Sequence, residues 1–229
     1  MRHTALVTET GPPAVPQLGP ASADTTPGPV ARPRGRRLPR RLGQLYAGLA
    51  LYGLSIALLV RAELGLVPWS VLDQGLSRST GLTLGTVSIL IGAVVLFTWV
   101  PLRQRPGVGT ISNVLVIGLS LDASLAVLPE GSGLPLRVAL VVVGVALNAL
   151  ATAAYIGVQL GPGPRDGLMT GLVRRTGRSV RLVRTGIEVV VVVLGVLLGG
   201  MLGVGTVVYA LAIGPLVQLL LPRVTVPLD

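Results

Sequence analysis

Long apolar runs, separated by short polar or glycine-rich segments, make up most of this chain. The runs are apolar throughout rather than striped, and several reach the roughly 18 to 25 residues that a helix needs to cross a bilayer. One helix over residues 183–222 would extend about 60 Å, twice the hydrocarbon thickness, so the glycines at 199–205 are read as a turn. We therefore predict six membrane-spanning helices, at 43–60, 82–102, 108–128, 138–160, 183–201 and 204–222.

The chain resembles itself at an offset of 96 residues, without a gap, from Gly48/Gly144 to about Leu125/Leu221. About a third of the aligned positions are identical, and they include glycines, prolines and threonines, which chance similarity between apolar segments would not align. This indicates an internal duplication, with repeat one at about 43–129 and repeat two at about 137–222.

Three spans per repeat is an odd number, so the second repeat enters the membrane from the opposite side. The charges agree with this inference, because arginine marks the cytoplasmic side of membrane proteins. In the loop at 61–81 two arginines balance two acids, whereas the equivalent segment at 161–184 carries six arginines and one aspartate. We predict an all-α polytopic membrane protein of six transmembrane helices in two inverted-topology three-helix repeats, with both termini cytoplasmic.

Each repeat contains a Gly-Pro phrase, LGLVPWSVLDQGLSRSTG at 64–81 and LGPGPRDGLMTGLVRRTG at 160–177. About a dozen residues with charges are too few to span a bilayer, so we predict a short interfacial or re-entrant helix after the first span of each repeat. Ser70 and Asp73 have the spacing of a capping box, and Asp166, equivalent to Ser70, is a candidate cap for the second helix. Alternatively, the helix N-terminus and Arg165 bind a carboxylate or phosphate.

Composition supports a chain that lies in the lipid bilayer: 51% of residues are hydrophobic and 12% are charged, against about 25% charged in soluble domains. Residues 1–42 are predicted to be a disordered, Pro- and Arg-rich cytoplasmic tail, and residues 223–229 a short one. The net charge of +10 invites a nucleic-acid reading. We expect no nucleic-acid partner, because the arginine cluster at 31–41 precedes an apolar run and has no interleaved aromatic residues.

Polar residues inside the predicted spans are candidates for function, because polar groups in hydrocarbon are costly. Asp122 is equivalent to Gln218, and Asn148 is equivalent to Tyr52. For Asn148, Asn113, Tyr52 and Tyr155, hydrogen bonds between helices are the alternative to ligand contact, and for Glu188 the alternative is an ion pair with Arg181 or Arg184. The candidate ligand or pathway residues are Asp122, Gln218, Asn148, Arg165, Asp166 and Glu188.

Several kinds of chemistry are disfavoured. The chain has no cysteine and one histidine, His3, so thiolate and multi-histidine metal sites are not expected. It carries no phosphate-binding loop, zinc-protease motif or paired catalytic carboxylates. We expect neither an enzyme nor a cofactor.

The two phrases, together with VRRTGRSVRLVRTGIE at 173–188 and ALAIGPLVQLLLP at 210–222, resemble the YczE/YyaS/YitT group of bacterial membrane proteins, most closely the YczE branch, over about 43–222. The second phrase keeps the GxGPxD pattern of that group, and the first departs from it at Val67 and Ser70. The resemblance implies a multi-pass protein of the bacterial cytoplasmic (inner) membrane, and it brings no substrate.

Two functions fit these observations. One is transport or binding of a small anionic or polar solute, which requires a water-accessible cavity lined by Asp122, Gln218, Asn148 or the Gly-Pro phrases. The other is a non-transporting scaffold or accessory protein for another complex, which would have a closed bundle and an exposed partner surface.

Overall fold

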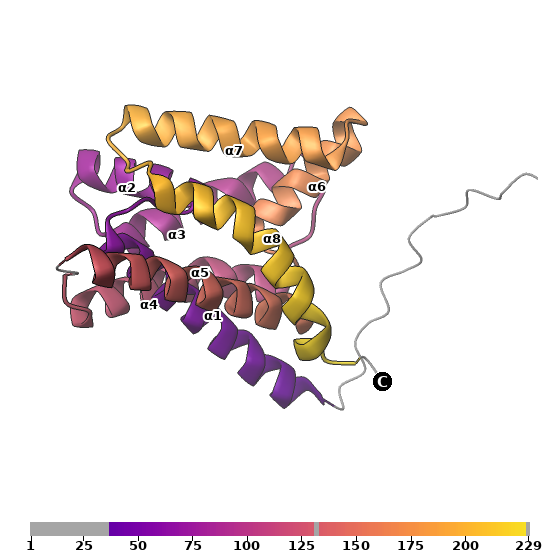
Figure 1. The fold of residues 1–229 in the computed structure, drawn as a ribbon. Helices are drawn as coiled ribbons and strands as arrows, with labels where there is room; N and C mark the ends of the chain where they lie inside the picture. The colour runs from indigo at the N-terminus through magenta and orange to yellow at the C-terminus, as the bar shows by residue number, and fades with distance from the viewer. Residues whose placement is uncertain (1–36, 131–132, 228–229) are drawn as a thin grey trace, which may run out of the picture. The chain divides into compact units, whose positions relative to one another are not determined.

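The computed structural model describes residues 37–130 and 133–227, so most of the predicted N-terminal tail lies outside the described residues. Within those ranges the chain forms eight helices and no strand, as the apolar runs predict (Figure 1). The helices are α1 (Leu38–Ala62), α2 (Pro68–Thr80), α3 (Leu84–Trp99), α4 (Val108–Val127), α5 (Leu134–Gly157), α6 (Pro164–Thr176), α7 (Val180–Leu197) and α8 (Val204–Val224).

Four of these helices, α1, α4, α5 and α8, are each long and apolar enough to cross a membrane. Helices α2 and α3 meet that test only together, and they are bent by 115° as in a broken span or a re-entrant loop. Helix α7 has 18 residues, but they include Arg181, Arg184 and Glu188. Length and composition therefore support four or five spans in the described chain, and the sixth stays a prediction.

The helices of the two halves correspond in sequence position. Each of the pairs α1/α5, α2/α6, α3/α7 and α4/α8 begins 96 residues apart, and α2 and α6 also end 96 residues apart. Unusual backbone angles recur with the same offset: φ is 51° at Glu63 and 53° at Gln159, and 125° at Gly65 and 129° at Gly161. The two Gly-Pro phrases thus adopt the same local turn, which glycine permits because it lacks a Cβ.

Helices α1 and α5 are equivalent in the repeat and pack against each other in opposite directions. The guanidinium of Arg41, near the start of α1, donates to the Val158 carbonyl just after the end of α5, with Nη2 at 2.6 Å. At the other end, Arg137 of α5 forms an ion pair of 2.7 Å with Glu63, which follows α1. Arg41 and Arg137 are themselves repeat equivalents, and each stabilises the carbonyl-rich end of the other helix.

The turns of each half also contact the other half. The Gly205 amide, in the first turn of α8, donates to the Leu64 carbonyl at 2.7 Å, and the equivalent Gly109 amide of α4 donates to the Leu160 carbonyl at 3.0 Å. The turn after the first helix of one half is therefore bonded to the last helix of the other. Figure 1 shows the result, in which α7 lies along α2 at one side and α1 along α5 at the opposite side.

Alanine at Gly161 should destabilise the protein, because φ there is 129° and a Cβ would lie 2.8 Å from the Thr110 Oγ1. The backbone strain alone is worth about 1–3 kcal/mol. Gly65→Ala should cost a similar amount, since its Cβ would lie 2.8 Å from the Thr206 Oγ1.

The matched control is Gly186→Ala in α7, where a Cβ meets no atom within 4 Å and helix propensity favours alanine. Thermal unfolding of each purified variant in detergent gives its melting temperature. A melting temperature of Gly161→Ala equal to that of Gly186→Ala would contradict the proposed strain.

Candidate functional site

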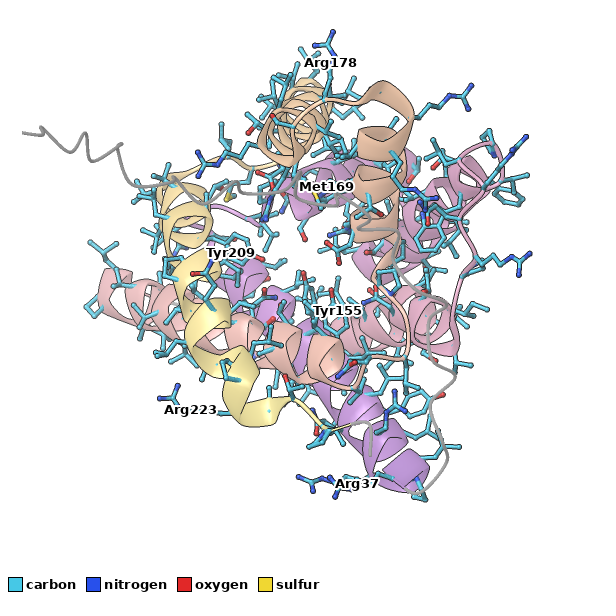
Figure 2. The ribbon with its side chains drawn as sticks, turned by 90° about the vertical axis from the view of Figure 1, so that its right-hand side faces the viewer. Arg37, Tyr155, Met169, Arg178, Tyr209 and Arg223 are labelled. Atoms are coloured by element: carbon cyan, nitrogen blue, oxygen red, sulfur yellow. The ribbon has the colours of Figure 1, made fainter. Side chains whose placement is uncertain are left out.

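Two cavities lie at the contact of the two halves. Cavity one has a volume of about 160 Å³ and cavity two of about 100 Å³, so each holds water molecules or a small solute. Tyr52, Arg165 and Asp166 line both cavities and therefore form their common wall. In Figure 2 the labelled Tyr155, Met169 and Tyr209 surround this region, which α1, α5, α6 and α8 border.

The cavities are equivalent by the repeat. Eight lining positions of cavity one have their counterparts, 96 residues away, in the lining of cavity two: Val67/Gly163, Pro68/Pro164, Trp69/Arg165, Arg184/Ser88, Glu188/Gly92, Tyr209/Asn113, Ala210/Val114 and Ile213/Ile117. The two linings differ in charge, because Arg184 and Glu188 of cavity one correspond to Ser88 and Gly92 of cavity two.

Arg165 is the residue through which the two Gly-Pro phrases meet. Its guanidinium carbon lies 4.6 Å from the centre of the Trp69 ring, a cation–π contact between repeat-equivalent positions. Its Nη2 lies 3.6 Å from the Asp73 Oδ2, in an ion pair between α6 and α2. The Arg165 side chain is 29% exposed, so it remains accessible from the cavities.

Asp73 and Ser70 do not cap α2, so that prediction is wrong. The helix begins earlier, at Pro68, with Val67 as N-cap and no capping side chain, because proline is preset for the first helical position. Both side chains are fully buried instead. Among the residues that the structure describes, neither the carboxylate oxygens of Asp73 nor the Ser70 hydroxyl has a hydrogen-bond partner.

Asp166 lies in the first turn of α6, whose N-cap is Gly163, so it does not occupy the N-cap position. Its Oδ2 accepts a hydrogen bond of 3.1 Å from the Tyr155 hydroxyl. The α6 N-terminus also favours the negative charge. The Tyr155 ring in turn meets the Tyr52 ring of α1 edge to face, with centroids 6.2 Å apart.

Asp122 and Gln218 line neither cavity. Asp122 accepts hydrogen bonds from the Thr83 hydroxyl at 2.5 Å and from the Gly85 amide at 2.7 Å, so its carboxylate caps the start of α3 from a neighbouring helix. Gln218 is exposed. The position of Asp122 in an apolar run predicted a functional role. In the structure its carboxylate instead binds the unsatisfied backbone and hydroxyl donors at the start of α3.

Asn148 also lines neither cavity and is fully buried. Its amide donates to the Ser55 hydroxyl at 2.7 Å and accepts from the Tyr209 hydroxyl at 2.9 Å, which is the hydrogen bonding between helices that was its alternative role. For Glu188 the two alternatives coexist: it forms an ion pair of 3.0 Å with Arg184, and it lines cavity one.

Trp69, Tyr209 and Arg184 were missed as cavity residues by sequence reasoning. A usable signal is the pairing of polar residues at the 96-residue offset, as in Tyr209/Asn113 and Arg184/Ser88. A second signal is aromatic placement: the chain has only seven aromatic residues apart from histidine, and Tyr52, Tyr155, Tyr209 and Trp69 all line the cavities.

An all-helical membrane protein with a polar site between two equivalent halves is thus the class that the fold defines. A family of unknown function, DUF6198, matches residues 39–222, and the chain belongs to that family.

The chain is 40% identical over 177 residues to an uncharacterised protein of Haemophilus influenzae, covering 77% of this chain and 81% of that one. It is 32% identical over 180 residues to the uncharacterised membrane protein YczE of Bacillus subtilis, covering 78% and 84%. YyaS of the same organism is 26% identical over 181 residues, covering 77% and 90%. The resemblance to the YczE group is confirmed, and no solved structure matches.

Replacing Asn148 by alanine should destabilise the protein, because it removes the amide that accepts from the Tyr209 hydroxyl and donates to the Ser55 hydroxyl, and Asn148 itself lines neither cavity. Two lost hydrogen bonds within a membrane domain are worth about 1–2 kcal/mol. Thermal unfolding in detergent should show a lower melting temperature than for Asn113→Ala, which removes an amide from the wall of cavity two. Equal losses in the two variants would argue against a structural role for Asn148.

Proposed function

We propose that this protein is a transporter of a small anionic or polar solute, and that the solute binds where the two cavities meet. The observation that carries the proposal is that two repeat-equivalent cavities share Tyr52, Arg165 and Asp166. Inverted-repeat transporters bind their solutes at such repeat interfaces, beside the N-termini of interrupted helices. The walls include the Gly-Pro phrases, which is the feature expected of a transporter and not of a closed scaffold.

The membrane architecture that we propose is two inverted repeats of three spans, with α3 and α7 as the middle spans. Support comes from the antiparallel packing of the equivalent α1 and α5. Helices of 16 and 18 residues extend about 24 and 27 Å, close to the thickness of the hydrocarbon core. The arginines near the start of α7 can reach the polar interface with their long side chains.

Both ends of the membrane domain are proposed to face the cytoplasm. The Gln44 amide, in α1, donates to the Val224 carbonyl at the end of α8 at 2.7 Å, so these two ends lie together. The end of α5 joins them, because the Val226 amide donates to the Gly157 carbonyl at 3.0 Å. The arginine-rich segment at 161–184 follows directly, which is consistent with a cytoplasmic position.

Within the shared wall, the Arg165 guanidinium favours an anion as solute, and the Asp166 carboxylate is already bound by the Tyr155 hydroxyl. Arg165 lies in the first turn of α6, where the backbone amides and the helix dipole also attract negative charge. The Tyr155 and Tyr209 hydroxyls already donate to Asp166 and Asn148, so the preference for an anion rests on Arg165 and the helix end. The same residues do not form a catalytic set, so we propose transport without chemical conversion.

Sidedness tests the inverted architecture. Thr80 and Thr176 are repeat equivalents, are both exposed, and each bonds the carbonyl four residues earlier, so they form a matched pair. Because the chain lacks cysteine, Thr80→Cys and Thr176→Cys can each be labelled specifically. We expect a membrane-impermeant thiol reagent on intact cells to modify Thr80→Cys at least tenfold faster than Thr176→Cys. Equal labelling from one side would contradict the inverted repeat.

Solute recognition is tested with wild type and Arg165→Ala. Metabolites inside and outside cells that lack or overproduce the protein should differ for at least one small polar compound. Arg165→Ala should abolish that difference, because it removes the cation common to both cavities. Arg174→Ala, on the same helix and outside both cavities, is the control and should behave as wild type. No differential accumulation in either strain would favour the scaffold function instead.

A further inference from the structure

The ion pair between Asp73 and Arg165 is weakly built. The carboxylate is fully buried, its oxygens have no hydrogen-bond partner within residues 37–130 and 133–227, and the Arg165 Nη2 is 3.6 Å away. An ionised carboxylate in a protein interior is stable only when it is paired and hydrogen-bonded. Within the described chain Asp73 has an ion pair but no hydrogen bond, so its negative charge depends on Arg165.

The other charged groups nearby have partners of their own. On α6, Asp166 is bonded by the Tyr155 hydroxyl. On α7, Glu188 and Arg184 pair with each other in the wall of cavity one. Helix α3 contributes Ser88 and no charged residue between Leu84 and Trp99. Arg78 of α2 itself is exposed and donates to the Gly199 carbonyl.

An anion that reaches Arg165 from either cavity competes with Asp73 for the same guanidinium. If Asp73 stayed ionised, two negative charges would share one cation in a buried site, which is unfavourable. If Asp73 takes up one proton, the charge of the site is conserved: Arg165 is paired with the Asp73 carboxylate before binding, and with the solute anion beside a neutral Asp73 carboxylic acid afterwards.

We propose that Asp73 is a proton-binding residue, and that a small carboxylate solute binds Arg165 together with one proton on Asp73. This inference rests on the proposed solute site. The repeat supports a single proton, because the positions equivalent to Asp73 and Arg165 are Met169 and Trp69, so the duplication does not reproduce this ion pair. Since Asp73 lies on α2 and Arg165 on α6, proton uptake also releases a bond between the two halves.

The experiment uses the full chain, purified in lipid nanodiscs, and a panel of monocarboxylates (acetate, lactate, pyruvate and benzoate) that stay ionised between pH 5.5 and 8.5. Calorimetry gives the affinity of each probe as a function of pH. With Asp73 ionised when free and neutral when bound, the affinity should fall tenfold per pH unit at the alkaline end. In buffers of different ionisation heat, wild type should take up about one proton per bound anion.

Asp73→Asn mimics the neutral acid, so it should bind the same probe with an affinity that does not change with pH and without proton uptake. Asp122→Asn, which removes a carboxylate outside both cavities, should keep the pH dependence of wild type.

Wild-type binding that is independent of pH, or an unchanged pH dependence in Asp73→Asn, would overturn the proton inference and leave the solute site intact. The calorimetric proton count on wild type decides the question even if Asp73→Asn does not fold. Failure of wild type to bind any probe would overturn this proposal, and Arg165-dependent uptake of a different solute in cells would still support the site.

Discussion

The antiparallel packing of α1 against α5 is the contact on which the rest of the fold depends. Small residues let the two backbones come close: a Cβ on Gly48 would lie 3.2 Å from the Tyr155 amide nitrogen, and one on Gly144 would lie 3.3 Å from the Ser55 carbonyl. With hydrocarbon outside, little hydrophobic gain remains between helices, so close packing and polar contacts must hold them. The ion pairs and hydrogen bonds of Arg41 and Arg137 at the two ends fix the register.

This packing explains why polar groups gather in the middle of an apolar protein. Because α1 and α5 run in opposite directions, the turns that follow them lie at opposite ends, and α2 and α6 begin where the two halves meet. Their first turns bring Trp69 and Arg165 into contact. The site is thus made by the two interrupted segments, and neither half contains it alone.

The positions of the short helices could be predicted from the sequence, because Gly and Pro act locally. Pro68 and Pro164 begin α2 and α6, and Gly81 and Gly177 follow them with φ of 74° and 66°. The partners of buried polar groups could not be predicted. Whether Asp122 faces a solute or a neighbouring helix end depends on packing across 37 residues to Gly85, which no local pattern contains.

The arginines of the second phrase show how one sequence feature combines two physical roles. Their number suggests an orientation signal, and Arg174, Arg175 and Arg178 are exposed as such a signal requires. Arg165 belongs to the same segment, yet it lies at the wall common to both cavities. In the first repeat the equivalent position is Trp69, on which the Arg165 guanidinium lies. Divergence of two equivalent positions into a cation and the ring that supports it therefore gives a fold with two similar halves one charged centre in place of two.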